Sequence, residues 1–288
     1  MFPTLPLAGR QRHAVHFLKQ APVAQLSSLV LGYWFIEDLK GAHEGRPIQT
    51  APSPTAVLTL NFGRPCTSDF AAGAPRASLL GIQSHRRDWR SGEGCAFVMV
   101  MLTPAGLARL FPASGQSTGD DLLELGAVLG DGASRRLVED LSAAWEPHRV
   151  AARLDAWLLE QLVTTKPLPE TERLARAWDV LRRTSRVEAA ARAVDVSTRQ
   201  LERWFQEHLG HSPRQVAALE RIHHSLLAAQ TGQGDPHEGF SDQAHRIRMW
   251  RRHLGLTPGR FARTPRSMMA DYFNPRREGS AAALAHFL

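Results

Sequence analysis

Apolar residues in the first 112 positions gather in short blocks that are separated by clusters of Gly and Pro. The strongest blocks are residues 56–62 and 95–102, and weaker ones lie at 29–36 and 78–82. Short apolar blocks between turn residues predict the strands of a small barrel or sandwich. We therefore expect a β-rich, barrel-like domain in the first part of the chain.

The spacing of apolar residues becomes helical beyond this region. Leu137, Leu141 and Trp145 lie four apart within Arg135–Trp145, and a second apolar stripe runs through Val150–Leu162. Both segments are predicted to be amphipathic helices. Such a stripe usually packs on its own domain, and the alternative is a homodimer formed through these two segments.

A second module follows a short segment that contains prolines. Residues 164–170 include Pro167 and Pro169 and predict a linker, so the first domain spans residues 1–163. Helical spacing from residue 171 to residue 266 predicts an all-α domain. The fold class is therefore α+β, and the tail over 267–288 carries no motif that suggests a role.

The helical module contains a repeat with an offset of 45 residues. Residues 209–213 (LGHSP) recur as 254–258 (LGLTP), and Phe205 corresponds to Trp250. In each copy Gly ends one helix, Ser or Thr caps the next, and Pro takes the first helical position. The repeat predicts two copies of one helical unit, joined by a rigid linker helix over 213–229.

The first copy has the pattern of a helix-turn-helix unit. An Ala-rich helix over 186–194 is followed by a turn at Asp195, a residue type that tolerates left-handed backbone, and Ser197 caps a second helix. Base-reading residues of this motif lie at the start of the second helix, on its polar face. The candidate DNA contacts are Ser197, Thr198, Arg199, Gln200, Glu202, Arg203 and Gln206.

Positive charge concentrates on the second copy. Residues 1–169 hold 16 Lys and Arg against 15 acidic residues, a balance of +1, and residues 170–288 hold 19 Arg against 13, a balance of +6. Residues 240–266 hold seven Arg and one Asp, which equals that whole excess. Because Arg matches phosphates and guanine edges, we predict double-stranded DNA as the partner. The candidate DNA contacts of this copy are Gln243, His245, Arg246, Arg248 and Arg252, and the candidate phosphate contacts of the module are Arg214, Arg251, Arg260 and Arg263.

Composition excludes several classes of protein. No apolar stretch approaches the roughly 20 residues that span a bilayer, and the start of the chain lacks the order of a signal peptide. We therefore expect a cytoplasmic protein with no membrane partner. Two cysteines cannot build a disulfide framework or a four-cysteine zinc site, and Cys66 and Cys95 are expected to be small apolar residues in or beside strands.

The first module lacks the patterns of an enzyme. It has no Gly-rich phosphate loop and no nucleophile elbow, and the charged segment 85–90 is expected to be a solvated loop. Its histidines are too scattered for a ligand set, so we expect no metal and no cofactor. In the strand-rich part, residues 1–112, these histidines are His13, His16, His43 and His85.

Two ordered motifs resemble those of the AraC/XylS transcriptional regulators. The first is 197–205 (STRQLERWF) with 210–213 (GHSP), and the second is 239–245 (GFSDQAH) with 255–261 (GLTPGRF). The resemblance covers about residues 170–266, and residues 60–63 and 104–107 look like the β-rich N-terminal domain of one branch of the family. It implies a bacterial regulator with two helix-turn-helix units for promoter DNA, an N-terminal domain that senses an effector or dimerises, and contact with RNA polymerase.

The second unit departs from the family pattern. Gln230–Glu238, which should supply its first helix, contains two Gly, one Pro and no apolar residue. We predict that this helix is missing or reduced to a turn, so that the second reading helix is poorly braced. Arg246 stands where the family usually has Leu or Phe, so it either turns toward phosphate or weakens the small core.

The sequence thus predicts a sequence-specific DNA-binding transcription regulator and no enzyme. One alternative is a DNA-repair enzyme with the same DNA-binding half, but relatives of that kind need a four-cysteine zinc cluster, and this chain has two cysteines. The other alternative is a ligand- or partner-binding protein with an impaired DNA-binding half. No polar cluster in residues 1–163 selects the chemical class of an effector.

Overall fold

The computed structural model describes residues 15–44, 47–68, 73–112, 119–143, 145–166, 169–274 and 284–288. Four features of the sequence analysis lie wholly or partly outside these ranges. They are His13, residue 144 of the first predicted helix, residues 167–168 of the predicted linker, and residues 275–283 of the tail. In the part of the chain that is described, no helix is both long and apolar enough to cross a membrane.

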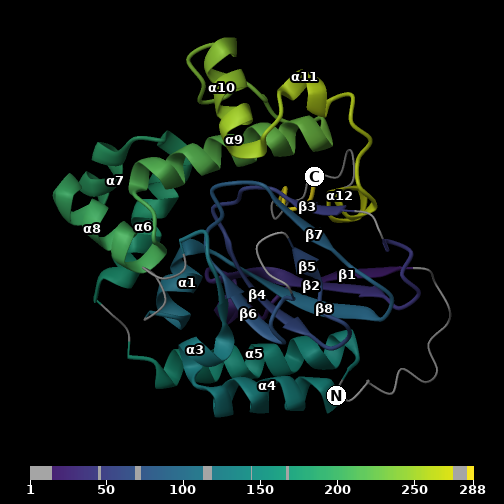
Figure 1. Cartoon of the computed structure of the whole chain (residues 1–288). Coiled ribbons are helices and arrows are strands. Elements are labelled where there is room, and N and C mark those ends of the chain that lie inside the picture. The colour runs from purple at the N-terminus through teal and green to yellow at the C-terminus, as the bar shows by residue number, and fades with distance from the viewer. Residues whose placement is uncertain are drawn as a thin grey trace.

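The first half of the chain is built on two antiparallel sheets (Figure 1). The three-stranded sheet has the order β3 (Pro47–Thr50), β7 (Arg87–Arg90) and β5 (Thr67–Ser68). The six-stranded sheet has the order β1 (His16–Gln20), β2 (Val30–Asp38), β8 (Cys95–Leu102), β4 (Ala56–Asn61), β6 (Ala77–Leu80) and β9 (Leu122–Glu124). The predicted β-rich domain is confirmed, and it is barrel-like only loosely, because the two sheets stay separate.

The central strands of the larger sheet are apolar on both faces. Tyr33 and Phe35 of β2 belong to one buried cluster, and Trp34 and Ile36 belong to another on the opposite face. A strand that is covered on both sides has a continuous rather than an alternating apolar sequence. The same cover on both faces explains why 95–102 is uniformly apolar, because the side chains of β8 alternate between these two clusters.

Two helices, α4 (Asp131–Ala143) and α5 (Pro147–Thr164), cover one side of the sheets, with α3 (Leu125–Leu129) next to them (Figure 1). Their apolar stripes face inward, and the Tyr33 hydroxyl donates to Asp155 of α5 at 2.6 Å. The first interpretation of these stripes is therefore confirmed. The stripes are occupied by the protein's own sheet, so they are not open to the homodimer suggested for Arg135–Trp145 and Val150–Leu162.

The second half is helical, as expected. It contains α6 (Pro169–Thr184), α7 (Val187–Ala193), α8 (Thr198–Leu209), α9 (Pro213–Thr231), α10 (Gln243–Leu254) and α11 (Pro258–Phe261). Gly210 and Gly255 both end helices with a φ of 70°. Ser212 and Thr257 both cap the next helix, and a Pro follows each of them. The 45-residue repeat is therefore structural.

The first helix of the second unit is missing, as the sequence predicts. Helix α9 ends at Thr231 with Gly232 in the left-handed conformation, and residues 236–239 form a turn. Gly234 and Gly239 also have positive φ, which a continuous helix does not allow. The chain therefore reaches α10 through a compact loop instead of a scaffold helix.

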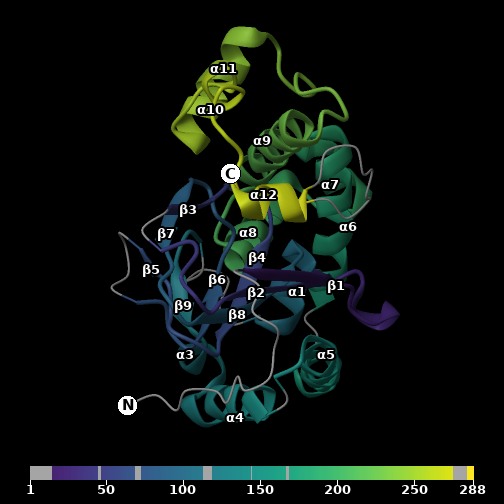
Figure 2. The same cartoon turned by 90° about the vertical axis from the view of Figure 1, so that its right-hand side faces the viewer.

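Two segments differ from expectation. Residues 87–90 were expected in a solvated loop but form β7, because they pair with both β3 and β5. The tail, whose role the sequence left open, forms α12 (Met268–Phe273) and returns to the first half at 284–288. Figure 2 shows α12 between the sheets and the helices of the second half.

The turn of the first unit offers a test of backbone strain. Asp195 has a φ of 55°, and the left-handed region costs an L-residue with a Cβ roughly 1–2 kcal/mol. We expect Asp195→Gly to leave the free energy of unfolding unchanged or raise it slightly, and Asp195→Val to lower it by about 1–2 kcal/mol. Urea unfolding of the two variants measures the difference. Equal stability of the Gly and Val variants would contradict the assignment of strain.

Candidate nucleic-acid interface

The first reading helix, α8, is sharply divided into a buried and an exposed face. Leu201, Phe205 and Leu209 are fully buried. The Ser197 hydroxyl accepts a hydrogen bond from the Gln200 amide at 3.1 Å, which fixes the start of the helix. The exposed face carries Thr198, Arg199, Glu202, Arg203 and Gln206, all of which were predicted DNA contacts.

Three of the predicted contacts of this unit, Ser197, Gln200 and Gln206, differ in how far their side chains are available to DNA. Ser197 is exposed although its hydroxyl is used as the cap, and Gln200 is half-buried. The Gln206 side chain donates to the Gly210 carbonyl at 3.1 Å, so it closes the end of its own helix. Arg199 and Arg203, which lie one turn apart, are therefore the long cationic side chains that this face presents to solvent.

The second reading helix, α10, begins at a side-chain cap provided by Asp242, which accepts from the His245 amide at 2.7 Å. Gln243, Arg248 and Arg252 are exposed. His245 is half-buried, and its Nδ1 lies 3.2 Å from the Ser241 hydroxyl. The exposed face of α10 is thus mainly cationic.

Arg246 does not lie on that exposed face. Its guanidinium donates to the Pro236 carbonyl at 3.4 Å, and its Nε is buried without a partner. The loop that replaces the scaffold helix therefore draws this side chain inward. Arg246 helps to hold the loop in this structure, and its predicted DNA contact is not supported by its placement.

Trp250 is the buried centre of the second unit. Its side chain packs against Leu226 of α9 and contacts Phe261 with ring centroids 5.5 Å apart. Its Nε1 donates to the Ser225 hydroxyl at 3.0 Å, and that hydroxyl donates to Pro236 at 2.6 Å. Ala51 of the first half and Ala285 of the tail complete the cluster. The expectation of a poorly braced helix is therefore corrected, because parts of the chain outside the second unit brace it.

The candidate phosphate contacts are all accessible. They are Arg214 at the start of α9, Arg251 on α10, Arg260 on α11 and Arg263 just after it. Together with Arg199 and Arg203 they place cations on both units. An arrangement of this kind suits a polyanion that runs along the two reading helices.

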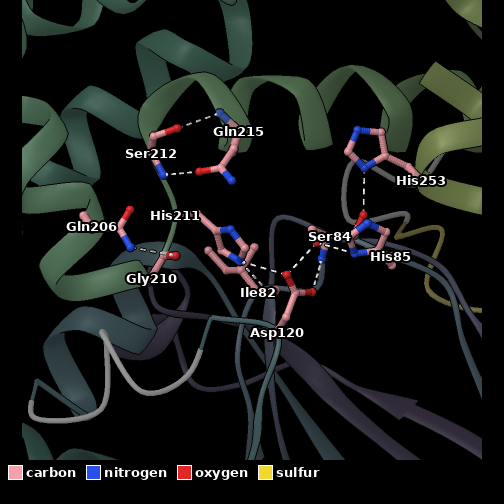
Figure 3. Close-up of polar contacts among 10 residues, drawn as sticks. All are labelled: Ile82, Ser84, His85, Asp120, Gln206, Gly210, His211, Ser212, Gln215 and His253. Atoms are coloured by element: carbon pink, nitrogen blue, oxygen red, sulfur yellow. Dashed lines mark hydrogen bonds and ion pairs between the residues drawn. The ribbon is translucent and has the colours of Figure 1, made fainter. Parts of the chain in front are cut away.

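A loop of the first half contacts both units (Figure 3). His211, in the turn after α8, donates from Nε2 to the Ile82 carbonyl at 2.9 Å. His253 of α10 donates from Nδ1 to the Ser84 carbonyl at 2.7 Å, and Asp120 accepts from the Ser84 amide at 2.6 Å. Sequence reasoning missed these contacts, because isolated histidines and a short polar loop have no periodic signal.

A small apolar cavity lies between the two sheets. It measures about 60 Å³ and is lined by side chains of both sheets, among them Ile48, Val57, Phe97 and Met99, and by His286 and Phe287 of the tail. Cys66 also lines it, and its sulfur lies 3.6 Å from that of Cys95. Both cysteines are free and buried, as expected.

Among the residues that the structure describes, one group of side chains lies close enough to be considered as metal ligands: Glu220, His223 and His224 on α9. Two of the three are already engaged. Glu220 accepts from Trp178 Nε1 at 2.6 Å, and His223 Nε2 accepts from the Ala285 amide at 3.0 Å. These bonds give the group a structural role, since it joins α9 to α6 and to the tail.

Residues 190–264 match the family model of a helix-turn-helix domain, which covers the region from within α7 to just beyond α11. No curated protein matches the chain by sequence. The similarity to solved structures is weak, and at this level it carries no argument.

Three solved structures show how weak this similarity is. ToxT from Vibrio cholerae O395 is 10% identical, with a TM-score of 0.42 over 76% of this chain and 93% of that chain. Unsaturated fatty acid bound ToxT from strain SCE256 is 11% identical, with a TM-score of 0.42 over 88% and 97%. The AraC-like transcriptional activator CuxR is 14% identical, with a TM-score of 0.22 over 67% and 80%.

Burial of Glu220 predicts a pH dependence of stability. Burial raises the pKa of Glu220 to about 7, against the smaller opposing effects of the Trp178 bond and Arg182. The folded chain then keeps a proton that the unfolded chain releases above its ordinary pKa of about 4.3. The free energy of unfolding therefore falls as the pH rises from about 4.5 to 7 and changes no further above that pH.

Glu220→Gln isolates this contribution, because the amide can still accept from Trp178 but does not titrate. We expect the variant to gain stability relative to the parent between pH 5 and pH 8, by an amount on the order of 3 kcal/mol. Urea unfolding at both pH values gives the difference. A constant difference between the two proteins would show that Glu220 does not titrate in this range.

Proposed function

We propose that the protein is a transcription regulator of the AraC type that binds specific promoter DNA through α8 and α10 while its N-terminal domain senses an effector. A helix-turn-helix domain supports double-stranded DNA as the partner. The observation that carries the proposal is the polar face of α8, where Arg199 and Arg203 are exposed opposite a fully buried apolar face.

The two units have different roles in this proposal. Helix α8 reads bases, because it presents two arginines and several hydrogen-bonding side chains at its first turns. Helix α10 grips phosphates, since Arg248, Arg251 and Arg252 are exposed and lie close together in sequence. Base contacts give specificity, whereas phosphate contacts fix position and give affinity that depends on salt.

Effector sensing by the N-terminal domain is supported by two features of that domain. The cavity between the sheets is apolar, and it lies in the same domain as the loop that contacts His211 and His253. A change at the cavity has a short route to both reading helices through that loop.

Homodimer formation and contact with RNA polymerase remain parts of the proposal that rest on the family resemblance. Because the stripes of α4 and α5 are buried, a dimer through these helices would use their outer faces. Val163, near the end of α5, is 86% exposed and is the large apolar side chain that such a surface offers.

Arg203→Ala tests the reading role of α8. We expect binding to the preferred site to weaken by about 1–3 kcal/mol, with relaxed preference at one base position and little change elsewhere. Selection of bound sites from a random DNA pool measures the profile for the parent and the variant. Arg173→Ala on α6 is the matched control, because it removes an exposed arginine away from both reading faces. An unchanged profile for Arg203→Ala would exclude the reading role.

Arg248→Ala tests the gripping role of α10. Loss of one phosphate contact should weaken binding to all sequences about equally and reduce the slope of log affinity against log salt by about 1. Titrations of the selected site and of an unrelated duplex at several salt concentrations give both quantities. A larger change of base preference in Arg248→Ala than in Arg203→Ala would reverse the assignment of the two units.

The second candidate function is a ligand- or partner-binding protein whose DNA-binding half is impaired, and the missing scaffold helix favours it. Filter binding of the full chain to random-sequence DNA at low and moderate salt separates the two functions. Binding that falls steeply with salt supports the regulator, whereas the absence of binding at low salt supports the impaired form.

A further inference from the structure

Residues 284–288 extend the smaller sheet of the first half by backbone hydrogen bonds. The Leu288 amide donates to the Gln49 carbonyl at 3.0 Å, and the Ala51 amide donates to the His286 carbonyl at 2.7 Å. Thr50 and Phe287 form an antiparallel bridge between these bonds. The segment is therefore held in a defined register next to β3.

This register directs Phe287 and His286 to the cavity between the sheets. Both side chains are buried and line it, and Phe287 lies next to Trp34 and Phe273 with ring centroids 5.9 and 5.6 Å apart. The remaining space is about 60 Å³. A cavity of about 150 Å³ accommodates benzene, and ligand pockets are commonly about 300 Å³ or larger. The cavity therefore admits a ligand only if one of its walls moves.

The same five residues are attached to the DNA-binding half. The Phe287 carbonyl accepts from the Gln230 side chain, at the end of α9, at 2.6 Å. The Ala285 amide donates to His223 at 3.0 Å, and Ala285 belongs to the cluster around Trp250. One short segment thus lines the cavity on one side and supports α9 and α10 on the other.

One buried polar atom of residues 284–288 has no hydrogen-bond partner in this position. His286 is 1% exposed, and its Nδ1 is buried without a hydrogen-bond partner. Burial lowers the pKa of His286 to about 3, so the side chain is neutral. A buried polar atom without a partner regains hydrogen bonds when it reaches water. Displacement of the segment would allow this nitrogen to form a hydrogen bond, which offsets part of the cost of the contacts that are lost.

We propose that Phe287 occupies the place of an apolar effector, and that effector binding displaces residues 284–288 and so removes support from α9 and α10. This inference rests on the proposed function, and it assigns the effector site and the means of regulation. A bound effector would loosen the second unit, because Ala285 leaves the cluster around Trp250. The expected consequence is weaker DNA binding in the presence of the effector.

The lining of the cavity indicates the class of ligand. Among the described residues around it there is no Lys, Arg, Asp or Glu, and the polar groups are amide, hydroxyl and imidazole side chains such as Asn61, Thr59 and Ser78. An ionised carboxylate or amine would lose its hydration without gaining a counter-charge. A neutral molecule with an aromatic or alkyl body and one or two hydrogen-bonding groups fits this lining.

The first experiment uses the neutral fluorescent probe N-phenyl-1-naphthylamine with the full chain. Phe287→Ala should bind it about tenfold more tightly than the parent, because the ligand no longer has to displace the ring. Val163→Ala is the matched control, because it truncates an exposed apolar side chain outside the cavity and outside residues 284–288, and its affinity should stay within about threefold of the parent. The anionic probe 8-anilinonaphthalene-1-sulfonate should show no such gain with Phe287→Ala.

A second measurement uses the parent chain and does not depend on the folding of a variant. Hydrogen exchange with and without saturating N-phenyl-1-naphthylamine should show faster exchange of the Ala51 and Leu288 amides, which bond to the segment or belong to it. The amides of α10 should also exchange faster, and those of α8 should not. Equal probe affinity of Phe287→Ala and the parent would overturn the proposal. Unchanged exchange at Ala51 and Leu288 would also overturn it, because the probe would then bind beside the segment.

These measurements separate this proposal from the proposed function, because neither of them uses DNA. If the chain binds the probe with the expected exchange changes but binds no DNA at low salt, the displacement of residues 284–288 is supported and the proposed regulatory function is excluded. If the chain binds DNA with the expected salt dependence but does not show the expected probe affinities and exchange changes, the regulatory function is supported and the displacement of residues 284–288 is excluded.

Discussion

Burial of Trp250 is the constraint on which the arrangement of the second unit depends. A helix-turn-helix unit normally covers such a residue with its own first helix, and here a loop with three left-handed glycines takes the place of that helix. The indole is nevertheless fully buried, in a cluster that also contains Ala51 of the N-terminal domain and Ala285 of the tail. The missing helix thus makes the second unit depend on the N-terminal domain and on the tail.

Several contacts between the tail and the second half of the chain are made at the end of α9. Gln230 donates to the Phe287 carbonyl, and its own side-chain oxygen accepts from Asn274 at 3.0 Å, while Arg266 donates to its backbone carbonyl at 2.8 Å. Each of these partners belongs to the tail or leads into it. A buried polar network of this kind is stabilising when its members are paired and becomes costly when one of them leaves. A change in the position of residues 284–288 would therefore break hydrogen bonds at the end of α9.

Local chemistry made part of this structure predictable. The strands at 56–62 and 95–102, the caps at Ser197 and Ser212, the left-handed Asp195 and the missing helix are all set by residues within a few positions of one another. The contacts of Gln230 with Phe287 and of His211 with Ile82 join residues 57 and 129 positions apart, and no periodic pattern marks them. The strand at 87–90 was missed for a related reason, since its charged side chains stay partly exposed and pairing alone makes it a strand.

The two reading helices are both tied to the N-terminal domain, but through different parts of it. Helix α8 packs on α6 and α7 of its own unit and also on α1 (Pro104–Leu110) of the N-terminal domain. Helix α10 is oriented by Trp250 and Leu254, whose cluster includes residues of the N-terminal domain and the tail. The positive charge of the second half also lies mainly on and after α10. Displacement of residues 284–288 would act on α10 through this cluster, and under the proposed division of roles it would change affinity more than base preference.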